Sequence, residues 1–136
     1  MISSIKYNRI SGNKVLFVDA DMPSAYLAHE ILSIRNIEMI YAGNGRDAIK
    51  IFLKDPFIGC LITELRLPGI EGFELLRTIR QINSSIPAIV QTAFAHNSII
   101  KLCIEAGFDE IVFKPINLVL FARMVQKYTL PSLVMN

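Results

Sequence analysis

Short apolar runs alternate with amphipathic segments along most of this chain of 136 residues. The apolar runs are rich in β-branched and aromatic side chains, as strands are, and they cover residues 15–19, 37–41, 60–64, 88–92 and 111–114. The segments between them carry apolar residues at helical spacing. Strands that alternate with helices predict an α/β fold, a doubly wound parallel sheet with helices on both faces.

Apolar stripes indicate which side of each helix should face the sheet. Turn signals such as Asn44-Gly45 and Pro68-Gly69 separate the elements, and Gly107 stands where a helix is expected to end. The stripes expected to pack on the sheet are Leu27, Ile31 and Ile34; Ala48, Ile51 and Phe52; Phe73, Leu76 and Ile79; and Leu118, Phe121, Ala122 and Val125.

The same pattern predicts one domain over residues 14–128, with flanks at residues 1–13 and 129–136. A chain of this length has room for one sizeable core. It contains no internal repeat and no low-complexity tract that would indicate a second unit.

Charge and composition argue against a nucleic-acid or membrane partner. The 14 Lys and Arg residues are scattered and the formal net charge is only +2, so no basic patch is visible. No apolar run approaches the ~20 residues that span a bilayer, and the N-terminus lacks the apolar core of a signal peptide. Cys60 and Cys103 lie on apolar faces, which predicts two buried free thiols in a reducing compartment. We therefore expect a cytoplasmic protein.

Polar residues stand at the ends of four predicted strands. They are Asp19, Glu64, Thr92 and Lys114. In an open parallel sheet, ligands bind beyond the carboxyl ends of the strands, where the strand order reverses. We therefore expect these four side chains to line one pocket.

The residues around these strand ends resemble those of response regulator receiver domains. The resemblance covers residues 14–128 and rests on Val18-Asp19, on the stretch 61–69, on Thr92-Ala93 and on Lys114-Pro115, in the order and spacing of that family. It implies a flavodoxin-like (βα)5 fold with strand order 2-1-3-4-5 and a cis Lys114-Pro115 bond. It also implies that Ala20, Asp21, Ala93 and Pro115 belong to the pocket.

The resemblance further implies a phosphoryl-transfer site. In the family, the acid at the position of Glu64 is an aspartate that accepts a phosphoryl group from a histidine kinase. Acids at the end of the first strand and the acceptor bind Mg²⁺, and the residues at the positions of Thr92 and Lys114 contact the phosphoryl oxygens. A metal, an ammonium and a hydroxyl together neutralise the charge on those oxygens.

This sequence departs from the family pattern at two pocket positions. Ala20 replaces the second of two adjacent acids, which in the family is a magnesium ligand. Asp21 either compensates or caps the helix that begins near Pro23, and we favour the cap. Glu64 is longer than aspartate by about one carbon–carbon bond, ~1.5 Å, and near-attack geometry tolerates little misplacement. We expect impaired phosphorylation, no bound cofactor, and at most weak Mg²⁺ binding by Asp19, Asp21 and Glu64.

Two hypotheses for Glu64 stay open. Its carboxylate reaches toward Thr92 and Lys114 as a phosphoryl oxygen would, and so mimics phosphorylation. Alternatively, Glu64 and Lys114 are a relic ion pair that neutralises buried charge. Receivers usually carry an aromatic switch residue three positions before the lysine, and Ile111 stands there. We therefore expect reduced conformational switching.

The last two predicted helices carry more apolar residues than one buried face needs. Besides the stripe Ile99, Leu102, Cys103 and Ala106, the first of them has Ile100 and Ile104, and Val119, Leu120 and Met124 lie off the core stripe of the second. Excess apolar surface indicates an interface. We predict one on this side of the sheet, formed by Ile99, Ile100, Leu102, Val119, Leu120 and Met124. It serves a homodimer, a neighbouring domain or a kinase, unless residues 130–135 fold back over it.

The function that we predict is that of a degenerate receiver domain, a signalling and protein-interaction module of a two-component phosphorelay pathway. The alternative is a working Mg²⁺-dependent phosphoacceptor, for example the receiver part of a hybrid histidine kinase. We expect no enzymatic activity of its own, because no nucleophile with an orienting base accompanies Asp19 and Glu64. The glycine-rich loops of nucleotide-binding proteins and the phosphate loop of FMN-binding flavodoxins are absent from the sequence.

Overall fold

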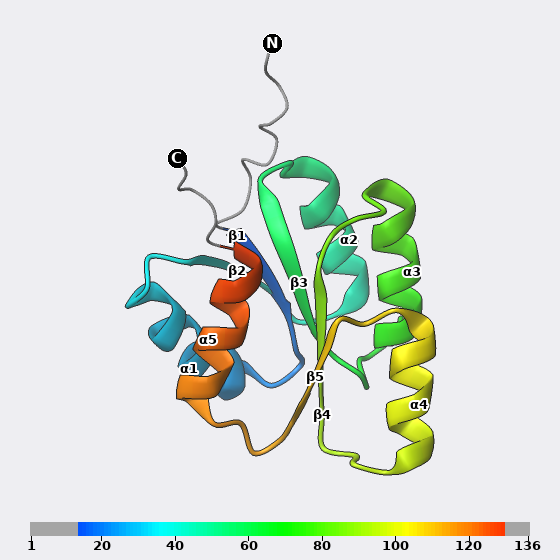
Figure 1. Cartoon of the computed structure of the whole chain (residues 1–136). Coiled ribbons are helices and arrows are strands. Elements are labelled where there is room, and N and C mark those ends of the chain that lie inside the picture. The colour runs from blue at the N-terminus through cyan, green and yellow to red at the C-terminus, as the bar shows by residue number, and fades with distance from the viewer. Residues whose placement is uncertain (1–13, 130–136) are drawn as a thin grey trace.

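A computed structural model describes residues 14–129, so the N-terminal flank and the tail 130–136 lie outside the described residues. Five parallel strands form the centre in the order β2-β1-β3-β4-β5 (Figure 1). They are β1 (Lys14–Val18), β2 (Glu38–Ala42), β3 (Ile58–Glu64), β4 (Ala88–Thr92) and β5 (Glu110–Phe113). The predicted flavodoxin-like sheet and its strand order are confirmed.

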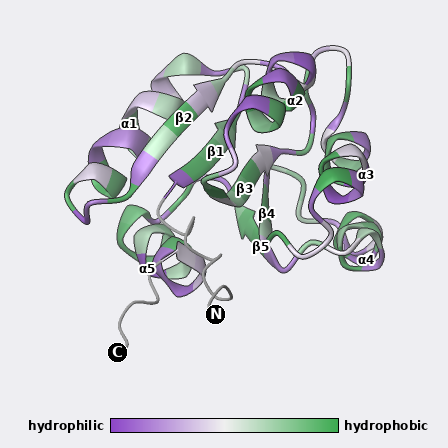
Figure 2. Ribbon diagram, turned by 90° about the horizontal axis from the view of Figure 1, so that it is seen from above, coloured by the Kyte–Doolittle hydropathy of each residue, from purple (hydrophilic) through white to green (hydrophobic). Residues whose placement is uncertain are grey.

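Helices cover both faces of this sheet, as the view in Figure 2 shows. They are α1 (Met22–Ser33), α2 (Gly45–Lys54), α3 (Gly72–Ile82), α4 (Asn97–Ala106) and α5 (Leu118–Thr129). One core cluster joins the sheet to α1 and α5, and the other joins it to α2, α3 and α4. None of the helices within residues 14–129 is long and apolar enough to cross a membrane.

Alternation along the strands sorts the core residues between these two clusters. In β4, Ala88 and Val90 face α2, α3 and α4, whereas Ile89 faces α1 and α5. Cys60 and Cys103 are buried free thiols in different clusters, as the sequence predicts. Because the sheet lies between the clusters, these two thiols cannot pair with each other.

The predicted core stripe of α1 is wrong at two of its three residues, and only Ile31 packs against the core as predicted. Leu27 and Ile34 are exposed, and the helix instead buries Ala25, Ala28 and Leu32. Both sets of residues have helical spacing, so periodicity alone does not choose between them. Alanine side chains let the helix lie close to the sheet, and this favours the observed face.

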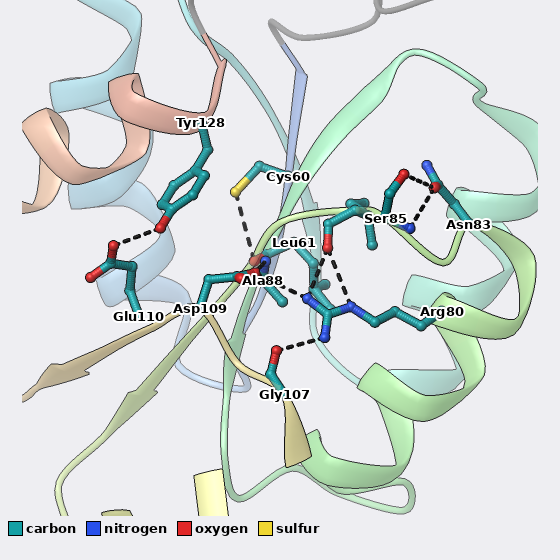
Figure 3. Close-up of polar contacts among 11 residues, drawn as sticks. Cys60, Leu61, Arg80, Asn83, Ser85, Ala88, Gly107, Asp109, Glu110 and Tyr128 are labelled. Carbon is teal, nitrogen blue, oxygen red and sulfur yellow. Dashed lines mark hydrogen bonds and ion pairs between the residues drawn. The ribbon is translucent and has the colours of Figure 1, made fainter. Parts of the chain in front are cut away.

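Arg80 is a structural tie between α3 and the segments that lead into β4 and β5 (Figure 3). Its guanidinium donates to the carbonyl of Gly107 at 2.6 Å and to that of Ile86 at 2.9 Å, and it lies 3.0 Å from Oδ2 of Asp109. The same Oδ2 accepts the backbone N–H of Ala88 at 2.8 Å. These bonds join the beginnings of β4 and β5. They therefore hold the end of the sheet that lies opposite the candidate site.

A second polar tie holds the end of α5 against β5. Oε2 of Glu110 accepts hydrogen bonds from Lys127 and from the hydroxyl of Tyr128, each at 2.6 Å; the bond to Tyr128 is drawn in Figure 3. These two donors hold the pKa of Glu110 below its ordinary value. The tie sets the position of α5 beside the edge strand β5.

Candidate functional site

Three charged side chains meet beyond the carboxyl ends of the central strands. Asp19 follows β1, Glu64 ends β3 and Lys114 follows β5. Nζ of Lys114 donates to Oδ2 of Asp19 at 3.1 Å and forms an ion pair with Oε1 of Glu64. The side chains of Asp19 and Glu64 are only 3% and 13% exposed, and that of Lys114 is 25% exposed. One ammonium therefore contacts two nearly buried carboxylates, and one negative charge is left in excess.

Burial and ion pairing shift the pKa values of Glu64 and Lys114 in opposite directions. Burial raises the pKa of the Glu64 carboxyl above its ordinary value, and the Lys114 ammonium only partly offsets this. For Lys114, burial lowers the pKa, but the bonds to Glu64 and Asp19 outweigh that effect and leave the pKa raised. Lys114 thus stays charged, and its ammonium favours the ionised form of Glu64.

Thr92 is buried at the end of β4 but is not part of this ion-pair cluster. Its Oγ1 accepts the backbone N–H of Phe94 at 3.0 Å. Within residues 14–129, no hydrogen bond joins Thr92 to Glu64. Of the two contacts that the phosphorylation-mimic hypothesis requires of Glu64, the structure therefore has the one to Lys114 alone.

Asp21 has the capping role that the sequence favours. Its Oδ2 accepts the backbone N–H of Ser24 at 3.2 Å and the Ser24 hydroxyl at 2.5 Å, at the first turn of α1. Its own backbone N–H donates to Oδ1 of Asp19 at 2.9 Å. The carboxylate of Asp21 is therefore directed to the helix, while its backbone helps to orient Asp19.

The donor set fits a magnesium ion poorly. Ala20 offers no side-chain oxygen, Asp21 is engaged by Ser24, and the ammonium of Lys114 lies between the two remaining carboxylates. Mg²⁺ requires a near-octahedral shell of oxygen ligands. Within residues 14–129, no three His, Cys, Asp or Glu side chains form a group that could hold a metal ion.

The other predicted pocket residues lie around this cluster. Ala20, Ala93 and Pro115 are exposed, and the Lys114–Pro115 peptide bond is cis. The predicted switch residue Ile111 is half-buried in β5 and packs against the core cluster of α2, α3 and α4. The arrangement can hold a carboxylate in place by charge.

Comparison with known proteins assigns the family. Residues 15–126 match the family described as response regulator receiver domain. The chain belongs to this family. It is 31% identical over 104 residues to a cyclic di-GMP phosphodiesterase of Thermotoga maritima, covering 76% of this chain and 27% of that protein. It is 27% identical to sporulation initiation phosphotransferase F of Bacillus subtilis, covering 85% of this chain and 92% of that protein.

A solved structure supports the same conclusion about the fold. A putative response regulator from Chloroflexus aurantiacus superposes with a TM-score of 0.80 at 26% identity, and the match covers 86% of this chain and 97% of that one. The match to the Thermotoga protein spans only about a quarter of its length, whereas the match to the Bacillus protein spans most of it.

The predicted interface residues divide into two groups. Leu102, Val119 and Leu120 are exposed, whereas Ile99, Ile100 and Met124 are half-buried, and Ile99 and Met124 pack against the core. The prediction that they share one side of the sheet is wrong, because α4 and α5 cover opposite faces (Figure 2). A surface that includes both helices must cross the edge strand β5, where Phe113 is exposed.

The fourth helix buries less than its stripe predicts. Cys103 is its buried residue, while Leu102 and Ala106 line an open cleft of about 550 Å³ with Phe73 and Leu76 of α3. The cleft lies between α3 and α4, and none of its lining residues belongs to the charged cluster. The apolar surface that the sequence detects on α4 is thus partly this cleft.

Two features of the receiver domain escaped the sequence analysis. The guanidinium of Arg66 lies 5.1 Å from the centre of the Phe94 ring and joins the loops after β3 and β4. Both side chains are exposed in loops, where periodicity carries no information. Gln91, in contrast, is fully buried. A polar residue inside the apolar run of β4 was the signal that could have found it.

Proposed function

We propose that this chain is a degenerate receiver domain, a signalling and protein-interaction module that is not phosphorylated in the manner usual for its family. Receiver membership supports a place in a two-component pathway. Membership alone leaves open whether Glu64 accepts a phosphoryl group. The arrangement of charge around Glu64 supports the degenerate alternative.

The observation that carries this proposal is the place of Lys114 between the carboxylates of Asp19 and Glu64. Asp19 and Glu64 carry two negative charges and Lys114 one positive charge, which leaves one in excess. A third carboxylate at position 20 would leave two and would strongly favour a divalent cation. With Ala20 there, Lys114 leaves only one negative charge unbalanced, so we expect no tightly bound Mg²⁺.

A permanent ion pair also suits a constitutive module. Receiver switching requires two states that a ligand or a modification binds differently. Here the ammonium is already engaged and Ile111 offers no ring that could move against Thr92. The domain is held near one state, and its partners bind it without a phosphorylation signal.

The alternative is a working phosphoacceptor, as in the receiver part of a hybrid kinase. Asp19, Asp21 and Glu64 would then have to assemble a metal site. This requires Asp21 to release Ser24 and Lys114 to move away from Asp19. Both rearrangements remove bonds that the structure makes, so this function is the less favoured of the two.

Incubating the whole chain with acetyl phosphate and Mg²⁺ and measuring its intact mass tests the proposal. We expect no phosphoryl adduct on the native chain, because the Glu64 carboxylate is displaced by about one bond length from the family position and is already paired. The Glu64→Asp variant, treated in parallel, controls for the length of the acid. An adduct located on Glu64 would mean that the receiver works and that the proposal is wrong.

The partners that we propose are a sensor histidine kinase or an output or neighbouring domain, in the cytoplasm, and the domain has no enzymatic activity of its own. The exposed apolar residues Leu102 of α4 and Val119 and Leu120 of α5 suggest a protein-binding surface, and a second copy of the chain is one candidate. Direct contact with nucleic acid or membrane is not expected.

A change at the exposed end of α5 tests the second copy as partner. Leu120 is 57% exposed, so Leu120→Asp should leave the fold intact and weaken self-association by about tenfold, since a desolvated carboxylate in an apolar contact costs at least ~1.4 kcal/mol. Sedimentation velocity over a range of concentrations measures it. Leu53→Asp on α2, where the leucine is 63% exposed, is the matched control. A monomeric native chain at the highest concentration would exclude the homodimer.

A further inference from the structure

Gln91 is the one residue of β4 whose side chain conflicts with its surroundings. It is 0% exposed, and neither its Oε1 nor its Nε2 has a hydrogen-bond partner among the described residues. A buried amide that makes no hydrogen bond is costly, and most buried polar groups in proteins are paired. A strand position that would otherwise take Val or Ile therefore has a reason to carry glutamine.

The sheet register places that amide next to Glu64. Glu64 of β3 and Gln91 of β4 are paired Cα positions, and Gln91 is in turn paired with Val112 of β5. Paired residues of neighbouring parallel strands point to the same face, and such strands lie about 4.8 Å apart. Because Ile89 and Val112 belong to the core under α1 and α5, Gln91 also faces that layer.

Glu64 has a matching unfilled capacity. Its Oε1 is buried, and it has no hydrogen-bond partner beyond the charge contact with the Lys114 ammonium. A carboxylate oxygen has two lone pairs, so Oε1 can accept one hydrogen bond in addition to its contact with Lys114. An amide with unused N–H groups and an acid with an unused lone pair thus occupy adjacent positions on the same face of the sheet.

We propose that Gln91 is a positioning residue for Glu64, acting through one bound water molecule. The water accepts a hydrogen bond from Nε2 of Gln91 and donates one to Oε1 of Glu64. A direct bond between the two side chains is not formed, and buried waters typically bridge polar groups that would otherwise be unpaired. The charged residues Asp19, Lys114 and Glu64 are then joined by one neutral residue, Gln91.

The link through Gln91 connects the site to a different layer of helices from the one that Thr92 faces. By alternation along β4, Thr92 points to the layer of α2, α3 and α4, against which Ile111 packs, whereas Gln91 points to the layer of α1 and α5. A change in the position of Glu64 is therefore transmitted to the layer of α1 and α5. This holds whether or not Glu64 accepts a phosphoryl group, so the inference does not depend on the proposed function.

A double-mutant cycle on the whole chain measures the link between the two residues. Gln91→Met and Glu64→Met each keep the length of the side chain and remove its hydrogen-bonding groups. We expect the two changes to be coupled by about tenfold in the urea unfolding equilibrium constant, because a hydrogen bond to a charged group is lost only once in the double variant. Additivity to within about twofold, near the usual error of such cycles, overturns the proposal.

Ile89→Val supplies the matched control for this cycle. Ile89 lies on the same strand and faces the same layer as Gln91, but it has no polar atom. Combined with Glu64→Met, it should be additive. A coupling as large as that of Gln91→Met would mean that packing alone links β3 and β4, and would also overturn the proposal.

A measurement on the native chain does not rely on variants that have to fold. The side-chain NH₂ protons of Gln91 should give a magnetisation-transfer signal to a long-lived internal water in NMR spectra. A purely structural glutamine would give no such signal. If the assigned Gln91 NH₂ protons contact no water, the bridge does not exist.

Discussion

Replacing Lys114 by methionine should destabilise the receiver domain by about 3 kcal/mol at neutral pH. Removal of one partner from a buried ion pair typically costs ~3–5 kcal/mol, because the remaining charge is left buried and unpaired. Lys114→Met leaves two such charges, the carboxylates of Asp19 and Glu64, whose side chains are 3% and 13% exposed. The side chain of Lys114 is 25% exposed, so water screens part of the interaction and the lower end of the range applies.

The same variant should recover stability as the solution is acidified. The pKa of Glu64 is raised in the folded chain from its ordinary value of 4.5, with burial as the main cause. A carboxyl group with a raised folded pKa binds its proton more tightly in the folded state, so protonation favours folding. Removing Lys114 raises that pKa further. The loss of unfolding free energy relative to the native chain is therefore largest above the pKa that Glu64 has in the folded variant. It shrinks as the pH falls below that pKa toward 4.5.

Urea unfolding of the native chain and of Lys114→Met, at neutral pH and near pH 5, measures both effects. Lys101→Met is the matched control, because Lys101 is exposed on α4 and takes part in none of the ion pairs within the described residues. Its effect should stay within about 0.5 kcal/mol at either pH. A loss of stability in Lys114→Met no larger than in this control would show that the cluster is solvated.

The charged cluster could be predicted from sequence because the topology of a parallel sheet brings the strand ends together. Once five strands are placed in a parallel sheet, their carboxyl ends meet at one edge, and the residues that end β1, β3 and β5 are read directly from the chain. The convergence of Asp19, Glu64 and Lys114 follows from that register alone. The direction of the Asp21 side chain followed from a local rule, the preference for aspartate before the first turn of a helix.

The features that sequence did not predict depend on contacts between distant segments. α1 has two apolar stripes, and only its neighbours select the one with Ala25 and Ala28. Arg80 is ordered by carbonyls and a carboxylate from other segments, and its sequence neighbours give no sign of them. That α4 and α5 cover opposite faces depends on how each connection crosses the sheet, which hydrophobic periodicity does not record.

The two hypotheses for Glu64 make different demands on Thr92. A mimic of phosphorylation has to engage both the lysine and the hydroxyl, because the phosphoryl oxygens contact both in the family. In this receiver the hydroxyl of Thr92 accepts a backbone N–H instead, and Glu64 engages Lys114. The structure therefore agrees better with an ion pair that neutralises buried charge than with a complete mimic. The Gln91 link would give that ion pair a route to the layer of α1 and α5.

Restoring the acids of the family at two positions should restore its chemistry. We expect the Ala20→Asp/Glu64→Asp variant to bind Mg²⁺ at least about tenfold more tightly than the native chain, since an added carboxylate ligand is worth ~1.4 kcal/mol or more. Three carboxylates beside Lys114 then leave two excess negative charges instead of one, and the shorter acid returns to the family position. The same variant should take a phosphoryl group from acetyl phosphate.

Calorimetric Mg²⁺ titration and intact mass after acetyl phosphate measure these two properties separately. Ala20→Asn/Glu64→Asp is the matched control, because asparagine has the shape of aspartate without its charge. If charge at position 20 is what the native chain lacks, the control should bind Mg²⁺ weakly and label slowly. Labelling of both variants at equal rates would place the whole defect in the length of Glu64. Labelling of neither would mean that Lys114, held by Asp19, keeps the metal out even when the acids are restored, and the ion pair would then be the decisive change in this receiver.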